Sequence, residues 1–281
     1  MGIKRVLKKS LQKLKEKEKQ RLELDNQRTA HNGLIGLFET AIRRYKTLSH
    51  ALSTLPLYIM SICCMAVALS PSVYLFRWVG KTVAAQPTLV QTGALAAAFA
   101  AGFFLYGFTL VVLVPFVNFM LRTNLHPWRG AYYSFGSLRW YIHNCLTYLV
   151  RYTFLDFMTP TPFNIMYFRA MGMKIGVDVQ LNTCNISDPS LIEIGDRATI
   201  GGSATIIAHY ASSGFLIVTP TKIGKGATIG LKATIMGGVT IGEYAVIMPN
   251  SVVLPKTVVP AGEVWGGVPA QLLEQRRKAA A

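Results

Sequence analysis

Residues 221–259 read TKIGKGATIGLKATIMGGVTIGEYAVIMPNSVVLPKTVV and carry an aliphatic residue at every sixth position. The series consists of Ile223, Ile229, Ile235, Ile241, Ile247, Val253 and Val259. Because side chains alternate along a strand and six is an even number, all of these residues face the same side. We expect three short strands and three turns to form one coil of a triangular stack, with the aliphatic column inside. One coil cannot bury its own apolar face, so stacking supplies the stability.

The six-residue spacing of aliphatic residues begins earlier in the chain and is interrupted once. Earlier members of the series are Ile175, Leu181, Ile194, Ile200 and Ile206. The spacing from Ile206 to Ile223 is 17 residues, which is not a multiple of six. A break in a repeat of this kind usually extrudes a loop on one face. We therefore expect an extruded loop here, opening at His209.

Residues 173–273 resemble the hexapeptide-repeat acyltransferases, a family whose fold is a left-handed parallel β-helix. The resemblance includes the segment Arg169 to Gly176 (RAMGMKIG) at the start and Gly266-Gly267-Val268-Pro269-Ala270 after the last coil. Within that family, Asp188-Pro189 and residues 194–210 resemble the C-terminal domain of the membrane-linked ε-poly-lysine synthetases. The left hand is carried over from the family, since most parallel crossovers are right-handed.

The resemblance implies that His209 is the catalytic base, which takes a proton from the acceptor as the acceptor attacks a thioester. An imidazole suits this task because its ordinary pKa lies close to neutral pH. Asp188 and Glu193 are the two candidates for a group that orients the imidazole. Asn182 and Asn185 either hold the acceptor or satisfy the backbone of a turn, and the sequence does not separate these roles.

The family resemblance also implies an acyl donor, the residues that bind this donor, and an oligomeric state. The donor is acetyl-CoA or another acyl-CoA, with backbone groups at Gly237 and Gly238 meeting the pantetheine. Trp265 is expected to close over it, and Lys232 or Lys256 to meet its phosphates. The family works as a homotrimer with sites between neighbouring chains, so we expect the same here. No metal is expected.

Two uncharged stretches precede the repeat, Thr47 to Phe76 and Thr82 to Leu121. A helix needs about 20 apolar residues to cross a bilayer, so residues 47–121 are expected to form two transmembrane helices. Lys and Arg residues flank this region on both sides, whereas the short connection carries only Arg77 and Lys81. By the positive-inside rule, both termini and the catalytic domain face the cytoplasm.

Composition agrees with a membrane protein. The 281 residues are 51% hydrophobic and 15% charged, with a net charge of +16, and no acidic residue lies between Glu39 and Asp156. A nucleic-acid-binding protein would be basic but less apolar, so nucleic acid is excluded as a partner. Residues 1–46 form a basic tail, or a helix lying on anionic lipid. Residues 122–172 are aromatic-rich and predict interfacial helices and a linker, and residues 274–281 are a basic tail.

The predicted function is therefore acyl transfer to a hydroxyl or amine of a membrane-associated acceptor, such as a lipid-linked sugar, a lipid head group or a peptide. One alternative is a non-catalytic trimeric membrane scaffold. Another is a lipid acyltransferase that takes its acyl group from acyl carrier protein. A zinc enzyme of the γ-carbonic anhydrase type needs three His ligands, and residues 173–281 contain only His209.

Overall fold

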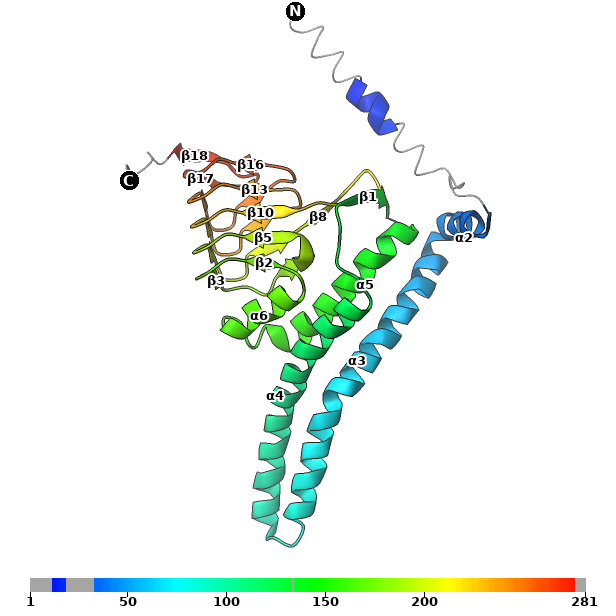
Figure 1. Ribbon diagram of the computed structural model, residues 1–281, viewed down its shortest axis with the longest axis vertical. Helices are drawn as coiled ribbons and strands as arrows, with labels where there is room; N and C mark the ends of the chain where they lie inside the picture. Colours follow the sequence, from blue (N-terminus) through cyan, green and yellow to red (C-terminus); the bar gives the residue numbers. More distant parts are fainter. Residues whose placement is uncertain (1–11, 19–32, 133, 276–281) are drawn as a thin grey trace, which may run out of the picture.

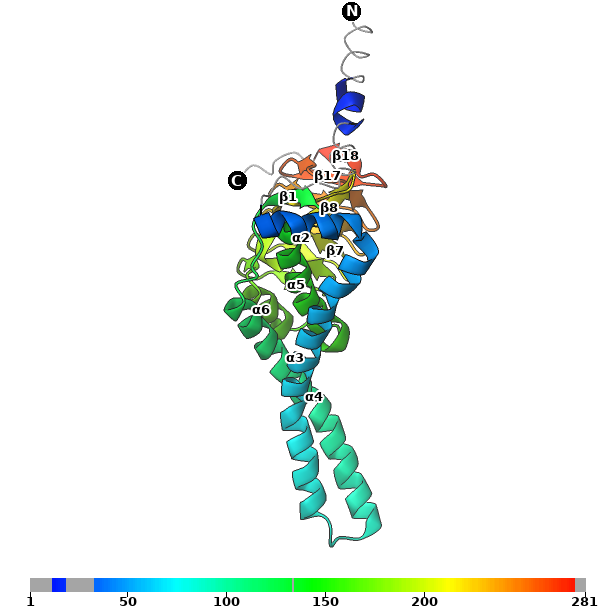
Figure 2. The same cartoon turned by 90° about the vertical axis from the view of Figure 1, so that its right-hand side faces the viewer.

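The computed structural model describes residues 12–18, 33–132 and 134–275. It has three parts: a pair of long helices, a junction of short helices, and a stack of short strands (Figure 1). Turned by 90°, the long helices remain a narrow stalk with the strands and junction gathered at one end (Figure 2). The repeat domain therefore lies entirely at one end of the helical pair.

The strands form a parallel β-helix whose coils each contribute one strand to each of three sheets. The five-stranded sheet contains β2 (Lys174–Ile175), β5 (Ile192–Ile194), β10 (Thr221–Ile223), β13 (Thr240–Ile241) and β16 (Val258–Val259). The six-stranded sheet contains β3 (Gln180–Leu181), β6 (Thr199–Ile200), β11 (Thr228–Ile229), β14 (Val246–Ile247), β17 (Glu263–Gly266) and β18 (Gln271–Gln275). The four-stranded sheet contains β4 (Ile186–Ser187), β7 (Thr205–Ile207), β12 (Thr234–Ile235) and β15 (Val252–Val253).

The aliphatic column predicted from the period of six is the core of this domain. Ile229, Ile235, Ile241 and Ile247 are each at most 1% exposed. Parallel pairing keeps the column in register, so that Ile223 lies beside Ile194 on one side and Ile241 on the other. The repeat prediction is confirmed, because the residues with the six-residue spacing are the ones that lose their contact with water.

The predicted loop break is an ordered β-hairpin. Strands β8 (His209–Ser212) and β9 (Phe215–Val218) pair antiparallel, and β9 pairs in turn with β1 (Trp128–Ala131). This small three-stranded sheet joins the repeat domain to a segment 84–90 residues earlier in the chain, from Ala131 paired with Phe215 to Trp128 paired with Val218. The break is therefore an attachment point between the repeat domain and the junction.

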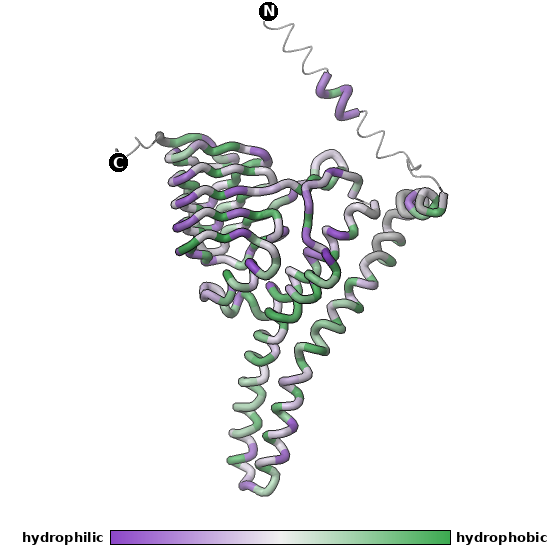
Figure 3. The backbone as a smooth tube through the Cα atoms, viewed as in Figure 1, coloured by the Kyte–Doolittle hydropathy of each residue, from purple (hydrophilic) through white to green (hydrophobic). Residues whose placement is uncertain are grey.

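The long helices are α3 (Lys46–Thr82) and α4 (Thr88–Met120), and α2 (Gly33–Arg44) precedes them. Thr54–Thr82 and Thr88–Met120 are each long and apolar enough to cross a membrane. Figure 3 shows the predominance of apolar residues along this stalk. Helix α3 continues through Pro56 and Pro71.

The junction consists of α5 (Phe135–Val150), a π-helical turn (Arg151–Leu155) and α6 (Pro162–Ala170). Its aromatic side chains were expected to lie in the membrane interface. Tyr152, Phe157 and Phe163 are exposed, and the interfacial position of the segment stays a prediction. Phe154, Tyr167 and Phe168 are almost completely buried, because they fill the space between α4 and the first coil. Gly107 of α4 permits this packing, since a Cβ there would come within 2.2 Å of the Phe154 ring.

The ends of the chain differ slightly from the predicted boundaries. Strand β18 pairs antiparallel with β17 and runs to Gln275, two residues past the boundary at 273. At the N-terminus, the described parts of the basic segment 1–46 are a helix at 12–18 and residues 33–46, which hold α2 and the start of α3. The rest of that segment, and residues 276–281 of the basic tail, lie outside the described residues.

Candidate functional site

His209 lies where the four-stranded sheet turns into the five-stranded sheet. We call this edge the hairpin corner; its successive levels are residues 188–191, 208–220, 236–239 and 254–257. The hairpin fills the second level, and the short turns of the other coils stack directly below and above it. At the level above, a Cβ on Gly237 would come within 2.7 Å of the His209 backbone nitrogen. Glycine at position 237 therefore lets the turn above close over the hairpin.

Asp188 lies one level below His209 and holds its ring. Its Oδ2 is 2.5 Å from His209 Nδ1 and accepts a hydrogen bond from the Ala208 amide at 3.1 Å, and Asp188 is fully buried. Burial raises the pKa of this carboxyl, but the hydrogen bond and charge of His209, followed by the Asn144 hydrogen bond, outweigh it. The net effect is that the pKa of Asp188 lies below its usual value.

The ionised Asp188 carboxylate determines which nitrogen of the His209 imidazole carries the proton. A carboxylate can only accept hydrogen bonds, so His209 Nδ1 must carry the proton that it shares with Asp188. In the neutral ring this leaves the lone pair on Nε2. The His209 side chain is 19% exposed, whereas Asp188 is sealed from solvent. The pair can therefore take up a proton at Nε2 while the carboxylate stabilises the resulting imidazolium.

Helix α5 forms the wall of this site from outside the repeat domain. One side of α5 and of the first residue of the π-helical turn, with a residue every third or fourth position, lies along β4 and the hairpin corner. The contacts are Trp140 with His209 (ring centroids 5.0 Å), Asn144 Nδ2 with Asp188 Oδ1 (2.8 Å), Tyr148 with Ser187 (2.7 Å) and Arg151 with Asn185 (2.5 Å). Residues three or four apart share one face of a helix, so a single docking surface sets all four contacts.

The sequence analysis did not identify Trp140, Asn144 or their neighbour His143. His143 is fully buried, and burial lowers its pKa to about 4 despite the opposing charge of Asp188. Its Nδ1 lies 2.9 Å from Asn118 Oδ1 near the end of α4. A signal was present in the sequence: His143-Asn144 is a polar pair inside an apolar aromatic segment. Buried polar groups require partners, and these two connect α5 to α4 on one side and to Asp188 on the other.

Asn144→Ala should weaken the hold on Asp188. A hydrogen bond to a charged group stabilises a protein by roughly 1.5–3 kcal/mol, whereas one between neutral groups contributes roughly 0.5–1.5 kcal/mol. We therefore expect a larger fall in thermal stability for Asn144→Ala than for the matched variant Tyr148→Phe, which removes the neutral bond to Ser187. Thermal unfolding of both variants in detergent measures this. Equal losses would show that the bond to Asp188 has no special strength.

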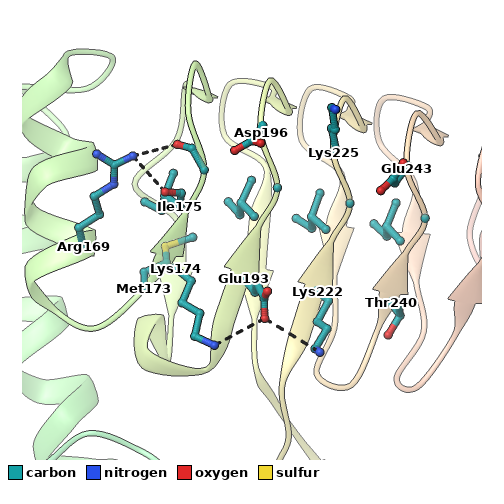
Figure 4. Close-up of a pocket in the computed structure, with 17 residues that line it drawn as sticks. Arg169, Met173, Lys174, Ile175, Glu193, Asp196, Lys222, Lys225, Thr240 and Glu243 are labelled. Carbon is teal, nitrogen blue, oxygen red and sulfur yellow. Dashed lines mark hydrogen bonds and ion pairs between the residues drawn. The ribbon is translucent and has the colours of Figure 1, made fainter.

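Glu193, the second candidate for orienting His209, lies elsewhere. It projects from β5 on the outer face of the five-stranded sheet, where its carboxylate lies 3.9 Å from Lys174 Nζ and 4.0 Å from Lys222 Nζ (Figure 4). Arg169, on α6, donates hydrogen bonds to the carbonyls of Ile175 and Gly176 in the same region. Exposed ion pairs of this kind stabilise a fold by at most about 1 kcal/mol. Glu193 thus belongs to a row of solvent-exposed charged side chains with Lys174 and Lys222 on neighbouring strands.

The candidate binding residues divide between the hairpin corner and other places. Gly237, Gly238 and Lys256 lie on the hairpin corner above His209, and Lys256 Nζ is 5.9 Å from the centre of the Tyr210 ring. Asn182, Asn185 and Lys232 lie on the next corner, where the six-stranded sheet turns into the four-stranded sheet. Asn185 accepts its hydrogen bond from Arg151 there, so its amide oxygen binds the junction.

Trp265 also lies away from His209. It occupies β17 in register with Ile247, is packed against the aliphatic core, and donates from Nε1 to Glu263 at 2.8 Å. In this position it covers the last coil of the column. Among the described residues, no group of three or more His, Cys, Asp and Glu side chains could hold a metal ion.

Part of the repeat matches a known protein-family model. Residues 220–255 match the family model described as bacterial transferase hexapeptide (six repeats). This segment of the repeat is therefore similar to the bacterial transferase hexapeptide repeat. The matched residues begin directly after the hairpin and cover the coils that stack above His209. The hexapeptide repeat thus carries the upper levels of the hairpin corner, including Gly237 and Gly238.

Individual relatives match part of this chain at low identity. Over 106 residues the chain is 27% identical to the delta-poly-L-ornithine synthetase of Acinetobacter baumannii (strain AB307-0294), covering 38% of this chain and 8% of that protein. A hexapeptide-repeat-containing acetyltransferase from Vibrio cholerae is 21% identical with a TM-score of 0.40, covering 48% of this chain and 92% of its own. A galactoside acetyltransferase in complex with coenzyme A is 20% identical with a TM-score of 0.40, covering 48% and 82%.

Proposed function

We propose that the protein is a membrane-anchored acyltransferase in which His209 is the general base and Asp188 orients it. The observation that carries the proposal is the hydrogen-bonded Asp188–His209 pair at the hairpin break of a chain that matches the bacterial transferase hexapeptide model. The pair has the arrangement a base needs, with one nitrogen held by a carboxylate and the other free to accept a proton.

The proposed reaction is transfer of an acyl group from a thioester to an alcohol or amine. The acceptor O–H or N–H gives its proton to His209 Nε2 while its O or N attacks the thioester carbonyl. The tetrahedral intermediate then collapses, the C–S bond breaks, and the proton passes from Nε2 to the departing thiolate. Asp188 stabilises the imidazolium during this cycle and stays ionised throughout.

The donor is proposed to be an acyl-CoA that lies along the hairpin corner. Gly237 and Gly238 lie directly above His209 on this corner, and Lys256 adds a cation there. The places of Lys232 and Trp265 on other parts of the β-helix do not favour the donor roles expected for them. The solved galactoside acetyltransferase contains coenzyme A, which supports a CoA donor by analogy. We further propose a homotrimer, in which a neighbouring chain would complete the donor groove.

Acyl transfer can be tested directly on the full chain in detergent or nanodiscs. Purified protein is incubated with ¹⁴C-acetyl-CoA and a bacterial lipid extract, and the extract is then analysed for labelled product. We expect labelled product together with stoichiometric free CoA. Absence of product together with intact trimers would favour the alternative, a non-catalytic membrane scaffold. Product formed only from acetyl-loaded acyl carrier protein would change the donor but keep the mechanism.

Both spans are proposed to place the repeat domain on the cytoplasmic face. The two helices end on the same side as the repeat domain, and the turn between them, residues 83–87, lies at the far end of the stalk (Figure 1). The catalytic pair would then work beside the cytoplasmic leaflet. A lipid-linked sugar, a lipid head group or a membrane-borne peptide therefore suits the site as acceptor.

This topology predicts where single cysteines react in a variant lacking the four native ones. Ala84→Cys, in the exposed turn between α3 and α4, should react with a membrane-impermeant maleimide on intact cells. The matched variant Tyr244→Cys, on the exposed surface of the repeat domain, should react only after lysis. The opposite pattern would invert the orientation, and labelling of neither before lysis would place the turn in the cytoplasm.

A further inference from the structure

A cleft beside the proposed catalytic pair has no role in the mechanism described so far. It has a volume of about 300 Å³ and is lined by Leu125, His126, Pro127, Trp128, Gly136, Arg139, Trp140 and Val218. All of these except Val218 come from outside the hexapeptide repeat. Val218 pairs with His209 across the hairpin, and Trp140 packs its ring edge-on to the His209 ring. The cleft and His209 thus share two walls.

The chemistry of the lining is aromatic and basic. Two indole rings line the cleft, Arg139 and His126 supply cationic or protonatable groups, and none of the described lining residues is acidic. Gly136, in the first turn of α5, lets the Trp128 ring lie against the helix, since a Cβ at this position would come within 2.6 Å of that ring. The buried Nε1 of Trp140 has no hydrogen-bond partner among the described residues. An acceptor with a phosphate and further oxygens matches these groups.

The position of the cleft indicates where such a phosphate would come from. Leu125 follows the end of α4 by five residues. Trp140 precedes Cys145 by five residues, about 8 Å along the helix, and Cys145 Sγ lies 3.4 Å from Ser61 Oγ in the first turns of the α3 span. Both walls are thus close to the ends of the apolar spans on the side of the repeat domain. This is the level at which lipid head groups lie.

We infer that this cleft binds the phosphate-bearing head group of a membrane lipid and presents its hydroxyl or amine to His209. The inference rests on the proposed function for the role of the bound lipid, but binding itself can be measured without turnover. It assigns the acceptor to phosphorylated lipids, with Arg139 as the main contact to the phosphate. A cationic side chain at the mouth and two indole walls give the cleft both charge and shape specificity.

The test uses the full chain in neutral detergent with dihexanoyl phosphatidic acid as the probe, and tryptophan fluorescence as the readout because Trp128 and Trp140 line the cleft. Dihexanoyl phosphatidylcholine, whose phosphate is neutralised by choline, is the control lipid, and inorganic phosphate is the soluble arm. We expect saturable binding of phosphatidic acid, weaker binding of the other two, and a Kd about 10–100-fold higher in Arg139→Gln. Arg122→Gln, which removes a cation at the end of α4 but outside the cleft, should bind like the unmodified protein.

Three outcomes would overturn the inference. Equal losses in Arg122→Gln and Arg139→Gln would mean general attraction to a basic surface. Binding of inorganic phosphate as tight as that of phosphatidic acid would mean an anion site that ignores the lipid. Absence of any saturable binding would mean that the cleft does not bind phosphatidic acid. Because these readouts need no acyl transfer, a failed cleft with an active enzyme is distinguishable from a lipid-binding protein with no transferase activity.

Discussion

His209→Ala is expected to reduce acyl transfer by about 10²–10⁴-fold, the usual effect of losing a general base. Affinity for acyl-CoA should change little, because the proton that His209 takes belongs to the acceptor. The fold should persist, since Asp188 keeps its hydrogen bonds from Ala208 and Asn144. Transfer of ¹⁴C-acetyl groups gives the rate, and equilibrium binding of acetyl-CoA gives the affinity.

His209→Asn is the matched control for a structural role. Its amide N–H lies near the place of the imidazole Nδ1 and can still donate to Asp188, but nothing replaces Nε2. Both variants should therefore lose transfer to a similar extent, while His209→Asn retains more thermal stability. Full activity in either variant would require a different base. Failure of both variants to assemble would mean that His209 is a structural residue.

Asp188→Asn is expected to lower both the rate and the stability. Three donors converge on the Asp188 carboxylate, from His209, Ala208 and Asn144. An amide has one acceptor oxygen and brings two donor hydrogens of its own, so at least one buried donor is left unpaired, at a cost of about 1–3 kcal/mol. The imidazole also loses the charge that stabilises its protonated form. We expect a rate loss of about 10²–10⁴-fold, and a lower melting temperature than in His209→Asn.

The pH dependence of this difference follows from the lowered pKa of Asp188. A carboxyl with a depressed pKa in the folded state stabilises the fold above its unfolded pKa of about 3.9 and loses that contribution as the pH falls through the folded value. The gap in melting temperature between the unmodified protein and Asp188→Asn should therefore be full at pH 6–7 and shrink below about pH 4. A gap that stays constant down to pH 3 would contradict an ionised Asp188.

The sequence by itself was sufficient for the features that repeat or extend along the chain. The spacing of six predicts which side of each strand is buried because side-chain direction in a strand is a local property. Ile229 and Ile241 are buried for that reason, and no distant contact is needed to place them. The two long apolar helices follow in the same way, because long uncharged apolar stretches are read from the sequence alone, and their length is enough to match a bilayer. The position of His209 at the break also follows from counting.

Only the tertiary structure decided what surrounds His209. Asp188 and Glu193 are close in sequence, but five residues take the chain around a corner, so one carboxylate lies under the imidazole and the other faces water beside two lysines. Asn144 contacts Asp188 across 44 residues of sequence, and the hairpin pairs with β1 across 84–90 residues. Such contacts depend on how α5 docks against β4. The packing of the whole α5 surface against the whole β4 surface determines this docking, and a periodic pattern in the local sequence does not predict it.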